Sequence, residues 1–143
     1  MITDNGLYFS DEQAVCNDGQ TEYATNAIDV GSAVNMAKGE PLGVFITVDE
    51  VFAGTGTTLT ISLVTATASD QTTGQEVLYS TPAIAKASLT AGRDPIILPI
   101  PPLAESGSGQ RYLGIKYYGD GTFETTGKVT AILQPLNAMQ TNL

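Results

Sequence analysis

Histidine and tryptophan are absent from this chain of 143 residues, and cysteine occurs once. Without an imidazole, the chain has no Ser–His or Cys–His nucleophile pair and no histidine-ligated zinc or iron site. A single cysteine forms neither an intrachain disulfide nor a cysteine-rich metal site. These absences predict a protein that is not an enzyme, with no catalytic residues and no need for a cofactor or metal.

Basic residues are also scarce: six Lys and Arg stand against fifteen Asp and Glu, which gives a formal net charge of −9. Such a charge repels phosphate backbones and anionic lipids, so we expect no nucleic-acid partner and no membrane association. Residues 1–6 contain no basic segment and no long apolar run, unlike a secretory signal. With 42% hydrophobic and 15% charged residues, the composition predicts a folded domain rather than a disordered acidic segment.

The acidic residues are concentrated near the start of the chain. Residues 1–50 contain nine acidic residues and one basic residue, whereas residues 51–143 contain six and five. Two interpretations remain open at this point. One is a solvated acidic face, which is the usual role of charge runs, and the other is an acidic surface that docks onto a basic partner surface.

Alternation of apolar and polar residues is common in this chain, and helical periodicity is rare. The clearest strand is 58–65, where Leu59, Ile61 and Leu63 alternate with Thr and Ser. We expect it to form a hairpin with 44–48 through the glycine-containing segment 52–57. Further strands are predicted at 7–9, 27–30, 76–80, 96–102, 111–118 and 128–133. The prolines of 96–102 place that segment at a sheet edge or lead it into a loop.

These short strands predict one all-β domain over residues 1–143, an antiparallel β-sandwich or jelly roll of about eight strands. At most one short helix is expected, within 83–92, ending at Gly92. In 111–118 the alternation puts Tyr117 on the buried face, so Tyr118 faces solvent or a partner. The sequence Gly119-Asp120-Gly121 predicts a tight turn through positive φ.

Carboxylates are the remaining candidates for acid–base chemistry, as the adjacent pairs Asp11-Glu12 and Asp49-Glu50. Neighbours on a strand point to opposite faces, so neither pair is expected to converge on one substrate. Glycosidases on β-sandwich folds usually also offer aromatic platforms for sugar, which disfavours that activity in a chain without Trp. Cys16 lies among acidic residues that raise a thiol pKa, which predicts an unreactive free thiol.

Several segments, in their order along the chain, resemble the Bbp16-like family of phage capsid cement proteins. They are residues 1–4, 7–15, 26–31, 39–42, 44–49, 56–61, 88–92, 98–102, 111–115 and 121–123. The resemblance implies a jelly-roll protein on the outer surface of an HK97-like capsid shell, where it staples neighbouring capsomers. It implies the major capsid protein as partner and carries over no catalytic residue.

Two function classes follow. The first is a virion structural protein on the outside of the phage capsid that also self-associates, as a homodimer or homotrimer. Its candidate capsid or subunit interface consists of Leu7, Tyr8, Phe9, Asp11, Glu12 and Tyr118. The second is a carbohydrate-binding β-sandwich of a phage tail or fibre, which the same fold permits. Glycan binding predicts a row of solvent-facing aromatic residues and often calcium.

Overall fold

Ten strands and one 3₁₀ turn occupy the part of the chain that the computed structural model describes, residues 8–17, 19–29, 42–100, 111–123 and 127–135. In chain order they are β1 (Tyr8–Ala14), β2 (Thr21–Tyr23), β3 (Ile28–Asp29), β4 (Leu42–Glu50), β5 (Thr58–Ala66), β6 (Glu76–Ser80), β7 (Ile84–Ala85), the turn η2 (Lys86–Ser88), β8 (Ile96–Pro99), β9 (Tyr112–Gly119) and β10 (Lys128–Pro135). The short helix expected within 83–92 is therefore one 3₁₀ turn preceded by a two-residue strand. Across these ranges, no helix has the length and apolar character needed to cross a membrane.

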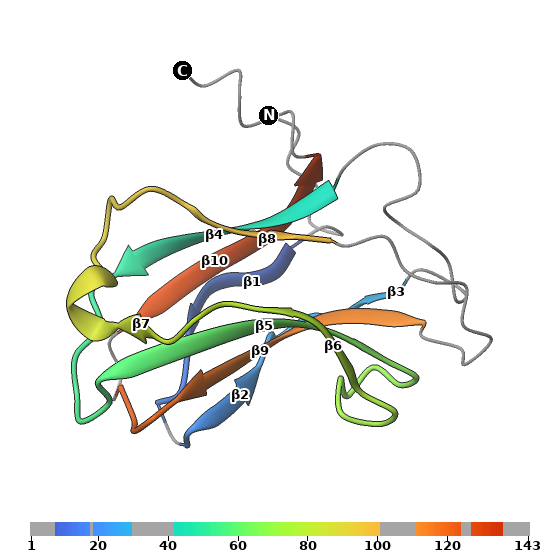
Figure 1. The fold of residues 1–143 in the computed structure, drawn as a ribbon, viewed down its shortest axis with the longest axis horizontal. Helices are drawn as coiled ribbons and strands as arrows, with labels where there is room; N and C mark the ends of the chain where they lie inside the picture. Colours follow the sequence, from blue (N-terminus) through green and yellow to red (C-terminus); the bar gives the residue numbers. More distant parts are fainter. Residues whose placement is uncertain (1–7, 18, 30–41, 101–110, 124–126, 136–143) are drawn as a thin grey trace.

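The strands form two antiparallel sheets stacked as layers (Figure 1). Sheet A has the order β1-β10-β4-β8, and sheet B has the order β2-β9-β5-β6, with β3 also on β9 and β7 also on β5. Since β2 and β3 pair with different parts of β9, and β6 and β7 with different parts of β5, the ten segments fill eight strand positions. The chain passes repeatedly between the sheets, and the first and last of the described strands, β1 and β10, pair. This is the arrangement of a jelly roll, and the predicted all-β sandwich of about eight strands is confirmed.

The hairpin predicted between 44–48 and 58–65 is wrong. β4 lies in sheet A between β10 and β8, whereas β5 lies in sheet B between β9 and β6. Each strand has nine residues and an apolar face that belongs to the core. In a sandwich these two faces are buried by stacking against each other, so the segment between the strands carries the chain from one sheet to the other.

The hydrophobic core lies between the sheets and consists of alternate residues of the long strands. Its central members are Val44, Ile46 and Val48 of β4, Leu59, Ile61 and Leu63 of β5, Leu113, Ile115 and Tyr117 of β9, and Val129, Ala131 and Leu133 of β10. As predicted, Tyr117 is buried while the neighbouring Tyr118 is 45% exposed. The edge position expected for the proline-containing segment is also confirmed, because β8 ends sheet A.

The turn after β9 differs from its prediction. Neither Gly119 nor Gly121 has a positive φ. These glycines instead permit close packing, since a Cβ on Gly119 would lie 2.7 Å from the carbonyl oxygen of Gly121. Between them, the Asp120 carboxylate accepts hydrogen bonds from the backbone N–H groups of Thr57 and Thr58, at 2.6 and 3.0 Å, and from the Thr57 hydroxyl. Asp120 thereby ties the end of β9 to the start of β5.

Lowering the pH is expected to destabilise the fold through protonation of the Asp120 carboxylate. The hydrogen bonds from the Thr57 hydroxyl and from the N–H groups of Thr58 and Thr57 lower the pKa of Asp120 to about 2. A carboxyl whose pKa is lower in the folded state stabilises the fold above its unfolded pKa and loses that contribution as the pH falls. Urea unfolding of Asp120→Asn should therefore show a flatter loss of stability than the unaltered protein between about pH 4 and about pH 2. Equal slopes would contradict this role.

Candidate functional site

The strand β1 carries most of the residues predicted to form an interface, and it is the edge of sheet A that lies farthest from β8. Phe9 is fully buried and belongs to the core, so its side chain offers no surface. Tyr8 is half-buried, and Asp11 and Glu12 are exposed. Leu7 lies outside the described residues. The candidate surface on β1 therefore consists of Tyr8, Asp11 and Glu12.

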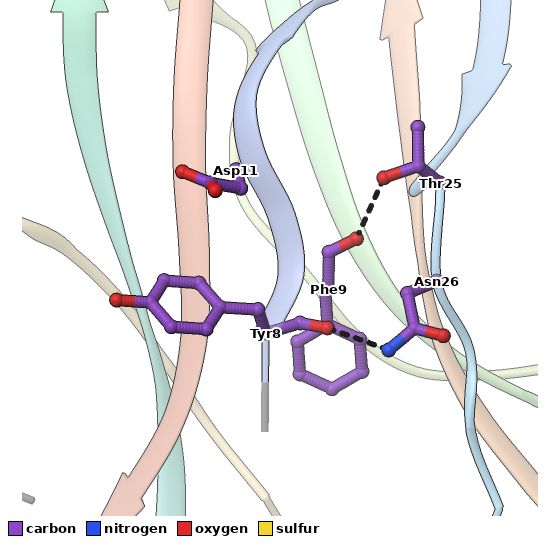
Figure 2. A pocket seen from close by; sticks show the side chains of 5 residues that line it. All are labelled: Tyr8, Phe9, Asp11, Thr25 and Asn26. Carbon is purple, nitrogen blue, oxygen red and sulfur yellow. Dashed lines mark hydrogen bonds between the residues drawn. The ribbon is translucent and has the colours of Figure 1, made fainter. Parts of the chain in front are cut away.

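The pairing of β1 with β10 is irregular, which determines how these side chains are presented. Its register shifts between Tyr8 and Ser10 and again between Ser10 and Gln13. Glu12 has a φ of 47° within the second irregularity, and its N–H donates to the Thr130 hydroxyl at 3.1 Å. Such irregularities bend an edge strand and redirect its side chains. Here they leave both acidic side chains exposed, with Asp11 on the same side of β1 as the Tyr8 ring (Figure 2).

A shallow hollow adjoins β1, lined by Tyr8, Phe9, Asp11, Thr25 and Asn26 (Figure 2). Asn26 forms one wall, because its side-chain Nδ2 donates to the Tyr8 carbonyl at 2.9 Å and its backbone N–H donates to the Phe9 carbonyl at 3.0 Å. The Thr25 hydroxyl also donates to the Phe9 carbonyl, at 3.3 Å. These bonds satisfy the carbonyls of the edge strand, so β1 is closed at this point to pairing with a further strand.

A buried polar network fixes β1 to sheet B beneath the hollow. The Ser10 hydroxyl donates to Gln13 Oε1 at 2.6 Å, so the Tyr117 hydroxyl, 2.9 Å from Ser10 Oγ, is the donor to Ser10. Burial raises the pKa of Tyr117, which keeps this hydroxyl protonated. Gln13 in turn accepts from the Thr25 N–H at 3.0 Å and donates to the Tyr23 carbonyl at 3.0 Å. These bonds connect β1 to sheet B next to the hollow.

The outer face of sheet A carries an apolar row that the sequence analysis missed. In the strand register, Tyr8 lies opposite Ile132, Ile132 opposite Phe45, and Phe45 opposite Ile97. We call these four residues the outer row; they alternate with the core residues of the same strands. A signal for it exists in the sequence, since 44–46, 96–98 and 131–133 are each three consecutive apolar residues, a pattern typical of strands covered on both faces. Beside the row, Gln134 is 2% exposed, and among the described residues its amide has no hydrogen-bond partner.

Tyr118 does not join this surface. It lies on β9 in sheet B, paired with Thr60 of β5 and Thr21 of β2. Its ring is exposed, as predicted, but on the sheet opposite to the one that contains Tyr8. The predicted interface residues therefore divide between two faces of the sandwich.

A model of the family Bbp16 matches residues 9–133 of this chain. The chain belongs to the Bbp16 family. Bbp16 is a phage-related family. No curated protein matches the chain. The Bbp16 match runs from β1 into β10, so it includes both sheets, the walls of the hollow except Tyr8, and three of the four outer-row residues.

Other acidic residues of this Bbp16 family member already have structural partners. The Thr130 hydroxyl donates to the Asp49 carboxylate, and Glu50 forms an ion pair with Lys128 at 3.5 Å. In the described ranges the other ion pair joins Arg111 and Asp29 at 2.7 Å. Neither ion pair involves Asp11 or Glu12, whose negative charges therefore remain exposed at the β1 edge.

Cys16 is buried next to Tyr117 and follows the sequence prediction. Burial, and secondarily the negative charge of Glu22, raise the pKa of the thiol to about 11. The Cys16 N–H donates to Glu22 Oε2 at 2.7 Å. A thiol with such a pKa is protonated and unreactive at neutral pH. The described part of the chain contains no cluster of three or more Cys, Asp or Glu side chains that could hold a metal ion.

Proposed function

We propose that this protein is a non-enzymatic structural protein of a phage virion, which binds the outside of an HK97-like capsid shell and staples neighbouring capsomers. The observation that carries this proposal is the Bbp16 match, which spans both sheets and assigns the chain to a phage-related family. The major capsid protein is its proposed partner.

The outer face of sheet A supports a role in protein contacts. The outer row crosses all four strands; its central residues, Phe45 and Ile132, are buried, so the accessible parts are its ends, Ile97 at 40% exposure and the half-buried Tyr8. Accessible aromatic and aliphatic side chains with polar or charged residues at their margin are typical of protein interfaces. Here the margin is provided by Asp11 and Glu12 on β1.

Self-association is part of the proposal. A capsid shell offers many equivalent positions, so a dimer or trimer of this chain makes several contacts at once. Linked contacts raise the overall affinity well above that of each single interface. Each interface between this protein and the shell can therefore be small and polar while the assembled layer stays attached.

The number of copies in a virion tests the proposal. Quantitative mass spectrometry of purified particles should give a fixed ratio of this chain to the major capsid protein, as a symmetric outer layer requires. A few copies per particle would contradict the capsid role and favour the carbohydrate-binding module of a tail or fibre. Absence from the particle would overturn any virion role.

A further inference from the structure

We propose that the hollow beside β1 receives a lysine or arginine side chain of the protein that this chain binds. The inference rests on the proposed capsid-binding function and specifies the chemistry of one contact. It concerns the hollow lined by Tyr8, Phe9, Asp11, Thr25 and Asn26. Two features of this hollow, the Asp11 carboxylate and the Tyr8 ring, favour a cation.

The hydrogen bonds that build the hollow run from Thr25 and Asn26 to the carbonyls of β1 and leave the Asp11 carboxylate as an acceptor. The Thr25 hydroxyl hydrogen is directed to the Phe9 carbonyl, and one N–H of the Asn26 amide is directed to the Tyr8 carbonyl. The two oxygens of the Asp11 carboxylate remain as acceptors on the side of β1 that carries the Tyr8 ring, whereas Thr25 and Asn26 lie on the other side (Figure 2). An ammonium or guanidinium group brings only donors, which is the complementary pattern.

The negative charge of Asp11 and the ring of Tyr8 also favour a cation. Asp11 is exposed, and neither ion pair of the described ranges involves it. Its carboxylate lies on the same side of β1 as the ring of Tyr8 (Figure 2). A cation placed between them gains a charge-assisted hydrogen bond and a contact with the electron-rich ring face. Glu12, the next residue, adds a second negative charge at this edge.

The test measures binding of the purified protein to empty capsid shells of the same phage that lack it. Asp11→Asn removes one charge and keeps the shape of the side chain. Asp94→Asn is the matched control, because Asp94 is an exposed aspartate just before β8, at the opposite edge of sheet A. We expect Asp11→Asn to weaken binding about fivefold in low salt, the effect of losing one exposed ion pair, and to reduce the salt dependence. Asp94→Asn should bind as the unaltered protein does.

A second variant tests the contribution of the Tyr8 ring to binding. Tyr8→Leu keeps an apolar side chain but removes the ring, so binding should weaken while its salt dependence persists. Thermal unfolding of each variant shows whether it is folded; Asp11 is exposed, so Asp11→Asn should unfold at an unchanged temperature.

The outcomes separate this inference from the proposed function. If the unaltered protein does not bind shells at all, the capsid-binding function is overturned. If it binds and Asp11→Asn binds equally well in low salt, the function stands and the cation contact is overturned. Binding of a neutral glycan in this hollow, insensitive to salt and to Asp11→Asn, would also overturn it.

Discussion

Replacing Gln71 with alanine is expected to lower the free energy of unfolding by about 3 kcal/mol, because two buried main-chain groups lose their partner. Gln71 is 4% exposed. Its side-chain Nε2 donates to the Ala24 carbonyl at 2.8 Å, and its Oε1 accepts from the Ile115 N–H at 3.1 Å. The amide thus bridges β9 and the segment between β2 and β3, pairing two main-chain groups that the direct backbone bond from the Ala24 N–H to the Ile115 carbonyl, at 2.9 Å, does not involve.

Urea unfolding of Gln71→Ala measures this contribution. Gln20→Ala is a suitable control, since Gln20 is exposed and its amide makes one hydrogen bond, to the Asp120 carbonyl. A surface change of this kind is expected to alter stability by about 0.5 kcal/mol or less. If the two variants lose the same stability, the bridging amide of Gln71 does not support the sheet.

Gln71→Glu separates the loss of hydrogen bonds from the loss of side-chain volume. A protonated carboxyl both donates and accepts, so it can replace the amide, whereas a carboxylate cannot donate to the Ala24 carbonyl. Burial favours the protonated form, so the folded state binds the proton more tightly than the unfolded state. Stability of this variant should therefore rise as the pH is lowered, relative to that of the unaltered protein. A constant difference at all pH values would contradict the bridge.

The sequence predicted the fold class because a half-buried strand shows alternating apolar and polar residues within a short segment. The alternation in 58–65 and 111–118 identified β5 and β9, and it separated the buried Tyr117 from the exposed Tyr118. The same reasoning failed for the partner of β5. Glycines between two strands show that the chain bends there, but they do not say whether it returns to the same sheet or crosses to the other one.

The candidate site could be predicted only in part. The exposed positions of Asp11 and Glu12 follow from their charge, but the burial of Phe9 depends on which face of β1 meets the core. Three consecutive apolar residues in a strand indicate that both faces are covered. Only the register between β10, β4 and β8 shows that Ile132 and Phe45 align into one row, and register is a property of the folded sheet.

No sequence pattern indicates the bridging role of the Gln71 side chain. It lies in the polar segment between β5 and β6, where a glutamine is ordinarily solvated. Its role depends on Ala24 and Ile115, which are far from it in the chain and meet it only after the sheets have formed. A side chain that bridges main-chain groups so distant in sequence is therefore found from the structure and not from the local pattern.

Phe123→Ala is expected to destabilise the protein by about 4 kcal/mol, the usual cost of emptying a fully buried phenylalanine site. The Phe123 side chain is 0% exposed at the end of the sandwich beyond β9. Its ring meets that of Phe52 edge to face, with 5.0 Å between centroids and an interplanar angle of 81°. Tyr118→Ala removes an exposed aromatic ring, and as a control it should cost much less.

The packing around Phe123 also predicts a coupling with Gly56. A Cβ on Gly56 would lie 2.6 Å from Cε1 of the Phe123 ring, so Gly56→Ala should destabilise the unaltered protein by about 1–3 kcal/mol through overpacking. In the Phe123→Ala background the ring is gone and the added methyl group has room. The double variant should then be more stable than the sum of the two single effects, by about 1 kcal/mol or more. Additive effects in urea unfolding would show that a contact other than the Phe123 ring requires glycine at position 56.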